Sequence, residues 1–350
     1  MGRPEPFAVD GVQMRMRTIA LTAALVASGA LAAPAQAKLV YVTGSGTPNS
    51  TVFLAGNTGE NPRRVGMGRA PTISPDGRWV AFVTVPTAGS EMDAVVLQRL
   101  DAGSQRLVMR ARSIDSLRFS PDSGKLGAIA AGRRVRVYDV ASGRLHDAAE
   151  GEIRGYSFSP DSKQIVVGRA EGKRFQAPSD LYAGPAMGGG KLTRITDFGR
   201  AMNPVWGPKE IVFDRFRRRK GDAPAFNLWA LDPAADPALR RLTRLKIPKL
   251  VSGLVPLELS SDARRLLSVF TGQDTEVGFT VATSSGKTRA LSRDFESGLV
   301  GFDLSANGRR ILAHTGGPDP AAAHDVVTIP YRGGEPKVLV EDAAYPDWTR

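Results

Sequence analysis

One short pattern recurs along most of this chain: an apolar strand, a Ser-Pro-Asp type of turn, and a second apolar strand. The copy at 156–170 is YSFSPDSKQIVVGRA. Tyr156 and Phe158 alternate with serines, as in a strand with one buried face. Pro160 fixes φ at about −65° at the second position of a tight turn, where Asp161 can close a side-chain hydrogen bond. We expect Asp161 and its counterparts to serve turns, not metal binding or catalysis.

The pattern returns roughly every 40–50 residues, the period of a four-stranded repeat. Each copy continues into a third strand, such as SDLYAG or FNLWALD, and a weaker fourth, such as KLTRIT or RRLTRL. These repeats predict an all-β fold, a β-propeller of four-stranded antiparallel blades. The first strands of the copies are expected at 71–74, 116–120, 156–159, 204–207, 256–260 and 301–305.

The two ends of the repeat region complement each other. The C-terminal AYPDWTR resembles a first strand with nothing after it, and residues 38–56 supply a second and third strand with nothing before them. We expect 345–349 to pair with 39–43, which closes the ring and removes exposed sheet edges. This gives seven blades. Six blades with an irregular N-terminal strand pair is the alternative.

The first 37 residues have the features of a leader. Basic MRMR at 14–17 precedes the apolar segment TIALTAALVASGALAAPAQA, which ends in a small-residue cleavage site at Ala35-Gln36-Ala37. We expect cleavage after Ala37, a single domain over 38–350, and a location outside the cytoplasm of a bacterium, secreted, periplasmic or associated with the cell wall. An uncleaved membrane anchor is the alternative; with the signal removed, we expect no transmembrane segment.

Charge and cysteine content limit the function classes. The net charge is +12, and it stays at +11 without residues 1–37, so the folded part is basic and favours anionic partners. We expect a protein or an anionic envelope polymer as the partner, no nucleic acid, and a monomeric chain. Absence of cysteine excludes disulfides, thiolate metal sites, a cysteine nucleophile and a lipid-modified cysteine.

The Ser-Pro-Asp-Gly turn between the first two strands resembles the repeat of TolB-like β-propellers, which is also found in the propeller domains of prolyl oligopeptidase relatives. APTISPDGRWVAFV, LRFSPDSGKLGAIA and YSFSPDSKQIVVGRA carry the resemblance, which covers about 38–350 and weakens in the later copies. The family implies a propeller, with six blades in TolB itself. No segment here matches the small α/β domain of TolB, so the resemblance does not extend to a role in the Tol system. The G-x-S-x-G elbow of the peptidase relatives is also missing.

Few residues suggest catalysis. The three histidines are His146, in a loop after a third strand, and His314 and His324, which flank a long loop. Metal-binding propeller enzymes need several histidines that converge, so we expect solvent-exposed histidines, no metal site and no cofactor. The Gly188–Gly190 run fits a flexible turn, since no helix follows it to make a phosphate-binding loop.

Basic residues gather in two of the predicted loops. Long loops from second to third strands share one face, where binding usually occurs on a rigid scaffold. We propose a basic, aromatic-edged patch there; a solvated hairpin tip is the alternative. Its members are Arg215, Phe216, Arg217, Arg218, Arg219 and Lys220, with Lys173, Arg174 and Phe175 of the preceding blade.

A second group of arginines is expected at the mouth of the central channel. Arg69 and Arg154 share one offset from their turns, Asp115 shares it too, and Arg112 and Arg200 lie in equivalent loops. Such arginines could grip a carboxylate or phosphate. Pairing of Arg69 or Arg154 with Asp115 is the structural alternative.

Together these features predict a non-enzymatic binding scaffold. Propeller loops present a broad rigid surface that needs no cofactor. The alternatives are a propeller enzyme, such as a glycan lyase or hydrolase, and a small-ligand sensor, either with its site at the central channel.

Overall fold

The computed structural model describes residues 38–84, 91–174, 177–220, 222–234, 239–249, 251–272, 275–291, 298–317 and 322–349. The regular structure over these ranges is entirely β-strand, and none of them contains a helix able to cross a membrane. The predicted leader, 1–37, and Phe175 lie outside the described residues. The all-β prediction is confirmed.

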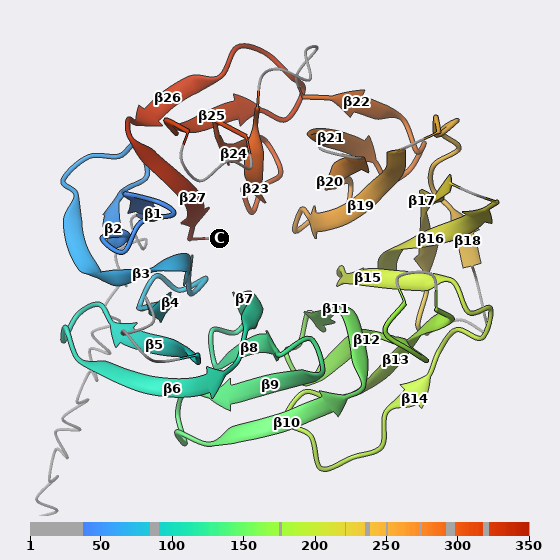
Figure 1. Ribbon diagram of the computed structural model, residues 1–350, viewed down its shortest axis with the longest axis horizontal. Helices are drawn as coiled ribbons and strands as arrows, with labels where there is room; N and C mark the ends of the chain where they lie inside the picture. Colours follow the sequence, from blue (N-terminus) through green and yellow to red (C-terminus); the bar gives the residue numbers. More distant parts are fainter. Residues whose placement is uncertain are drawn as a thin grey trace, which may run out of the picture. The chain divides into compact units, whose positions relative to one another are not determined.

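The strands form antiparallel four-stranded units, which follow one another around a common centre (Figure 1). The first strand of each unit lies nearest that centre. These inner strands are β3 (Arg63–Ile73), β7 (Ile114–Phe119), β11 (Glu152–Phe158), β15 (Ala201–Trp206), β19 (Val251–Leu259), β23 (Val300–Leu304) and β27 (Ala343–Trp348).

The second and third strands are rich in buried aliphatic side chains. Second strands are β1 (Lys38–Thr43), β4 (Trp79–Thr84), β8 (Lys125–Ala130), β12 (Gln164–Ala170), β16 (Ile211–Arg219), β20 (Arg265–Gly272) and β24 (Arg310–His314). Third strands are β2 (Thr51–Gly56), β5 (Asp93–Arg99), β9 (Arg134–Asp139), β13 (Ser179–Pro185), β17 (Asp222–Leu231), β21 (Thr275–Ala282) and β25 (Val326–Pro330).

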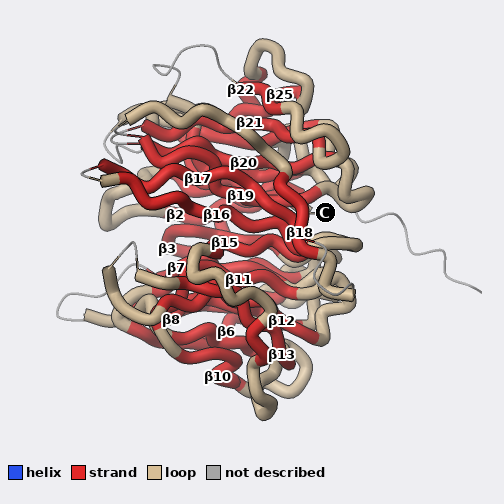
Figure 2. Tube along the Cα trace, turned by 90° about the vertical axis from the view of Figure 1, so that its right-hand side faces the viewer, coloured by secondary structure: helices blue, strands red, loops and turns tan. Residues whose placement is uncertain are grey.

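The fourth strands are the outermost and several are very short. They are β6 (Gln105–Ala111), β10 (Leu145–Glu150), β14 (Thr193–Arg194), β18 (Leu239–Arg241), β22 (Thr288–Ala290) and β26 (Lys337–Val340). In the unit of β27, β1 and β2, the first half of the long β3 takes this place, because Arg63–Met67 pairs with β2 while Gly68–Ile73 pairs with β4. Seen from the side, the strands occupy the middle and loops gather on both sides (Figure 2).

The first and last strands of the described chain pair with each other. β27 is antiparallel to β1, with Leu39 opposite Trp348 and Thr43 opposite Ala343. The Lys38 backbone N–H also donates to the Thr349 hydroxyl at 3.0 Å. The predicted contact between the two terminal segments is therefore present.

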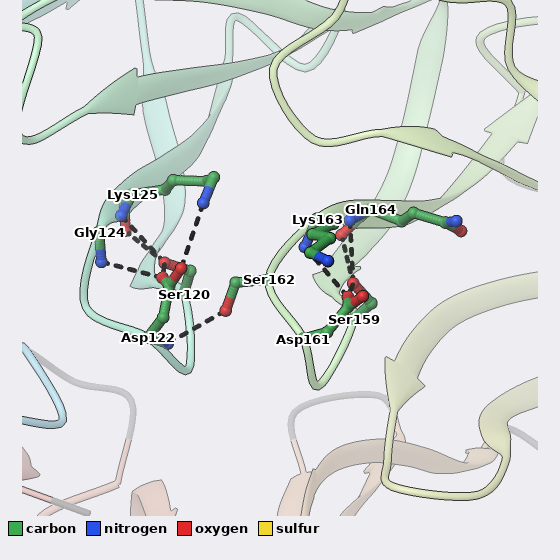
Figure 3. A network of polar contacts seen from close by, with 9 residues as sticks. All are labelled: Ser120, Asp122, Gly124, Lys125, Ser159, Asp161, Ser162, Lys163 and Gln164. Carbon is green, nitrogen blue, oxygen red and sulfur yellow. Dashed lines mark hydrogen bonds and ion pairs between the residues drawn. The ribbon is translucent and has the colours of Figure 1, made fainter.

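The Ser-Pro-Asp turns are held by one repeated hydrogen-bond pattern (Figure 3). The Ser120 hydroxyl donates to Asp122 at 2.5 Å and accepts the Lys125 N–H at 2.9 Å. Successive turns are also joined, because the Asp122 N–H donates to the Ser162 hydroxyl at 3.0 Å. In the next turn, the Ser159 hydroxyl and the Lys163 N–H donate to the Asp161 carboxylate, and these hydrogen bonds lower its pKa. The prediction that these aspartates serve the turns is confirmed.

Inner-strand side chains reach the next inner strand. The Ser157 hydroxyl accepts the Trp206 N–H at 3.1 Å, and the Glu258 carboxylate accepts the Leu304 N–H at 3.1 Å. The Asp347 carboxylate accepts the Ile73 N–H at 2.9 Å and so joins β27, the last strand, to the inner strand β3. These bonds satisfy backbone donors at places where adjacent sheets are not paired.

The core lies between neighbouring units. One buried cluster joins Val95 and Leu97 to Leu126 and Ala128 of the next unit, and another joins Val166 and Leu181 to Phe213. Both faces of each sheet are therefore covered by apolar side chains, which explains why the second strands are nearly continuous runs of aliphatic residues.

We expect Ser120→Ala to lower the free energy of unfolding by about 1–3 kcal/mol, because it removes a buried hydroxyl that serves both the aspartate and a backbone N–H. Equilibrium urea unfolding measures this. Ser104→Ala is the matched control, since the exposed Ser104 hydroxyl has no hydrogen bond among the described residues. Equal effects of the two substitutions would contradict a structural role for the turn serine.

Candidate functional site

The hairpin of β16 and β17 carries the basic segment. Residues 215–219 and 222–226, predicted as part of a loop, instead extend β16 and β17, with Arg215 opposite Asn227 and Arg217 opposite Ala225. The prediction of a loop was wrong because alternation of basic with apolar residues, Arg215-Phe216-Arg217, is also strand periodicity. Arg215 and Arg217 consequently share one face of the sheet, and Phe216 lies on the other.

That face borders a cleft of about 750 Å³. It is lined by β16, β17, β18 and the linkers before β15 and before β19. Its uncharged lining includes Asn227 and Trp229. Six basic residues line it: Arg200, Arg215, Arg217, Arg241, Arg244 and Lys246.

The cleft has no negative charge of its own among the described residues. None of the lining residues is acidic, and none of the six cations has a carboxylate within ion-pair distance in the described part of the chain. Cations brought together without counter-charges repel one another. The arrangement is therefore suited to an anion that enters from outside.

Arg215 is the most enclosed of these cations. Its guanidinium lies over the ring of Phe198 at 4.1 Å and over that of Trp229 at 4.6 Å from each ring centroid. Burial lowers the pKa of Arg215, and the charges of Arg200 and Arg241 lower it further. Stacking between two aromatic rings holds the guanidinium in place and leaves its N–H edge for a ligand.

The preceding unit shows how the same position is neutralised elsewhere. Asp180 lies opposite Arg169 on β13, and the Arg194 guanidinium donates to Asp180 at 2.5 Å. In the unit of the cleft, the corresponding residues are Asn227, opposite Arg215, and Arg241. The correspondence is set by identical bonds: Nε of each arginine, Arg194 and Arg241, donates at 2.8 Å to the carbonyl of the threonine two residues on. An amide thus replaces the neutralising carboxylate.

Asn227 shapes the wall of the cleft. Its side-chain oxygen accepts the Thr243 hydroxyl at 2.9 Å and the Leu245 N–H at 2.8 Å, and its amide donates to the Leu245 carbonyl at 3.2 Å. These bonds fix the linker that carries Arg244 and Lys246. Asn227 therefore keeps the linker in place without adding a negative charge.

The structure brings only some of the predicted patch together. Arg200, Arg215 and Arg217 line the cleft, whereas Lys173 and Arg174 are not among its described lining residues. Phe216 is also a lining residue, but it is only 2% exposed and packs against Phe226 and Met202, so its ring does not form the expected aromatic edge.

The rest of the basic run has other contacts. Arg219 donates to the carbonyls of Pro248 at 2.7 Å and Val251 at 2.6 Å, and so ties the hairpin to the next linker. Lys220 is exposed near the hairpin end, and Arg218 has contacts of its own.

Two of the arginines expected at the channel mouth, Arg69 and Arg154, are engaged within the protein, whereas Arg200 lines the cleft. Arg69 pairs with Asp93 at 2.6 Å, and Arg154 donates to the Lys173 carbonyl at 3.0 Å. The expected pairing with Asp115 is wrong, because Asp93 at the start of β5 is the carboxylate that Arg69 reaches. Asp93 also accepts the Ile114 N–H at 2.9 Å, so it joins two units.

Comparisons with known proteins give a fold. No protein-family model matches the sequence, and no curated protein has significant sequence similarity to it. Among solved structures, TolB from Acinetobacter baumannii is 16% identical, with a TM-score of 0.51, over 91% of this chain and 67% of that one. The β-propeller domain of the Trilobed protease from Pyrococcus furiosus is 15% identical, with a TM-score of 0.65, over 88% and 96%. Oligogalacturonate lyase from Vibrio parahaemolyticus is 10% identical, with a TM-score of 0.58, over 88% and 87%.

The chain has a TolB-like β-propeller fold. The chain resembles these structures in fold only. The same fold occurs in proteins with different names, one of which is a lyase. Residues of this TolB-like propeller must therefore be judged by their own surroundings, and the cleft is the cationic site that its geometry defines.

The histidines of this TolB-like propeller differ from expectation. His314 and His324 are buried, with exposures of 1% and 6% and ring centroids 5.0 Å apart, and burial lowers the pKa of His314 to about 4. His146 lies within β10, not in a loop. The expectation of exposed histidines was wrong because His314 ends a second strand, where its neighbours are core. Among the described residues, no group of three or more potential ligands could hold a metal ion.

A buried carboxylate lies next to the cleft in sequence. Asp214 is fully buried on the face of β16 opposite Arg215, and burial raises its pKa to about 7. Neither oxygen has a well-formed hydrogen bond among the described residues, although the Asn203 side chain partly offsets the shift. Ionisation of this buried carboxylate therefore lowers the stability of the folded protein.

The low pKa of His314 makes stability rise with pH between about 4 and about 6.5, so the contribution of Asp214 is read as the difference between the natural chain and Asp214→Asn. We expect Asp214 to make stability fall as pH rises from about 4 to about 7, because folded Asp214 keeps a proton that the unfolded chain, with a pKa of about 3.9, releases. Asp214→Asn should remove this slope and add up to about 4 kcal/mol above pH 7. Urea unfolding across this pH range measures both. Exposed Asp342→Asn is the control, and an unchanged slope in Asp214→Asn would contradict the assignment.

Proposed function

We propose that this protein is a non-enzymatic binding scaffold that holds an anionic partner in the cationic cleft. The observation that supports this most directly is the gathering of six cations in a cleft that has no carboxylate among its described lining residues. In a propeller, such a site rests on strands and hydrogen-bonded linkers, so it is organised before the partner arrives. The partner is a protein or an anionic polymer.

We propose also that the four-stranded units are seven blades and that the β1–β27 pairing closes their ring. The seven inner strands and the pairing of the chain ends support this. The basic segment and small-residue site before Lys38 support export, with cleavage after Ala37, and action outside the cytoplasm at the cell envelope.

An enzyme that acts on an anionic glycan is a second candidate. It is favoured by one fold neighbour, whose name is oligogalacturonate lyase, together with the positive cleft. Incubation with oligogalacturonate, followed by the ultraviolet absorbance of unsaturated products, tests it. Product formation that is lost in a cleft variant would establish the enzyme and overturn the non-enzymatic scaffold.

Heparin affinity chromatography tests whether the cleft is the anion site. We expect Arg217→Gln/Arg244→Gln/Lys246→Gln to elute at clearly lower salt than the natural chain, because exposed cations of the cleft are removed. The control, Arg64→Gln/Arg144→Gln/Lys191→Gln, removes the same charge from exposed positions outside the cleft. Equal shifts in the two variants would mean that only diffuse charge binds.

A further inference from the structure

We propose that the ligand of the cationic cleft carries two or more phosphoryl groups close together. This rests on the proposed function, since it names the chemistry of the anion that the same cleft holds. The cleft, its cations and the comparison with the neighbouring unit carry the argument.

Charge density favours phosphoryl groups over carboxylates. Six cations share a cleft of about 750 Å³. A carboxylate brings one negative charge, so six would be needed to balance them. A phosphate monoester brings about −1.5 to −2 and three acceptor oxygens, so about three or four such groups balance the cleft, which is fewer than the carboxylates needed.

The cations offer the donor geometry that phosphates use. Five of the six are arginines, whose planar forks bind phosphate oxygens in pairs. Arg215 is held between Phe198 and Trp229, so little side-chain freedom is lost when it binds.

The amide at Asn227 keeps the site open for a multivalent anion. A carboxylate there, as at Asp180 of the preceding unit, would pair with Arg241 and repel a phosphate. Asn227 satisfies its linker with neutral hydrogen bonds instead. A ligand that contacts Arg200 and Lys246 would also connect the linkers on either side of this unit.

Isothermal titration calorimetry of the full chain with sodium tripolyphosphate tests the proposal, at fixed pH and about 0.15 M salt, where diffuse surface charge is screened. Citrate supplies clustered carboxylates and orthophosphate supplies a single phosphoryl group. Vesicles of phosphatidic acid in phosphatidylcholine, measured by sedimentation, show whether phosphoryl groups on a lipid surface also reach the cleft.

We expect tripolyphosphate to bind at least tenfold more tightly than citrate or orthophosphate. Asn227→Asp should weaken it at least tenfold, because the new carboxylate neutralises Arg241. Unfolding temperature without ligand reports whether Asn227→Asp folds. Arg217→Gln/Arg244→Gln/Lys246→Gln, which changes only exposed side chains, should give the same loss, and Arg64→Gln/Arg144→Gln/Lys191→Gln should not.

The outcomes separate this inference from the proposed function. Citrate binding as tight as tripolyphosphate, and lost in the cleft variants, would overturn the phosphoryl assignment and leave an anion-binding cleft. No binding of any anion would overturn both. Tripolyphosphate binding that survives in both cleft variants would place it elsewhere and overturn the inference. Vesicle binding that requires the cleft cations would support a phosphoryl group presented on a membrane.

Discussion

Most of the repeats, though not the one with Gly207 in this place, depend on one interaction, that of the turn-serine hydroxyl. It receives a backbone N–H from the start of the second strand and donates to the aspartate of the turn, as Ser120, Ser159 and Ser260 all do. The turn thereby sets the register of the inner hairpin, and bonds between successive turns link neighbouring units. Because these few hydrogen bonds of the turn hold the hairpin, the residues outside the turn can vary from unit to unit.

This variation is where the site arises. Two adjacent units place an arginine, an aromatic ring and a second arginine at corresponding positions, with Tyr182 under Arg169 in one and Trp229 under Arg215 in the other. They differ at the residue between, which is Asp180 in the first and Asn227 in the second. One exchange of a carboxylate for an amide separates a cluster that contains an ion pair from one whose arginines have no carboxylate among the described residues.

The sequence was sufficient for the fold because a repeated turn and alternating strands report local structure directly. It was less informative for the site, since most of the loop expected at 215–226 belongs to β16 and β17, and the side chain of Phe216 is buried. The basic residues Arg241, Arg244 and Lys246 were missed although RRLT at 240–243 aligns with TRIT at 193–196, and FNLW with SDLY. That alignment would have found the exchange at Asn227. The stacking of Arg215 and the burial of Asp214 depend on packing between units, which no local pattern encodes.

Crystals of the protein soaked in sodium selenate would show directly where a tetrahedral anion binds, because selenium scatters anomalously. The cleft should hold the strongest anomalous peak, between Arg215 and Arg241, and crystals of Asn227→Asp should lack it. Selenate peaks confined to exposed arginines elsewhere, with none in the cleft, would contradict an uncompensated anion site there.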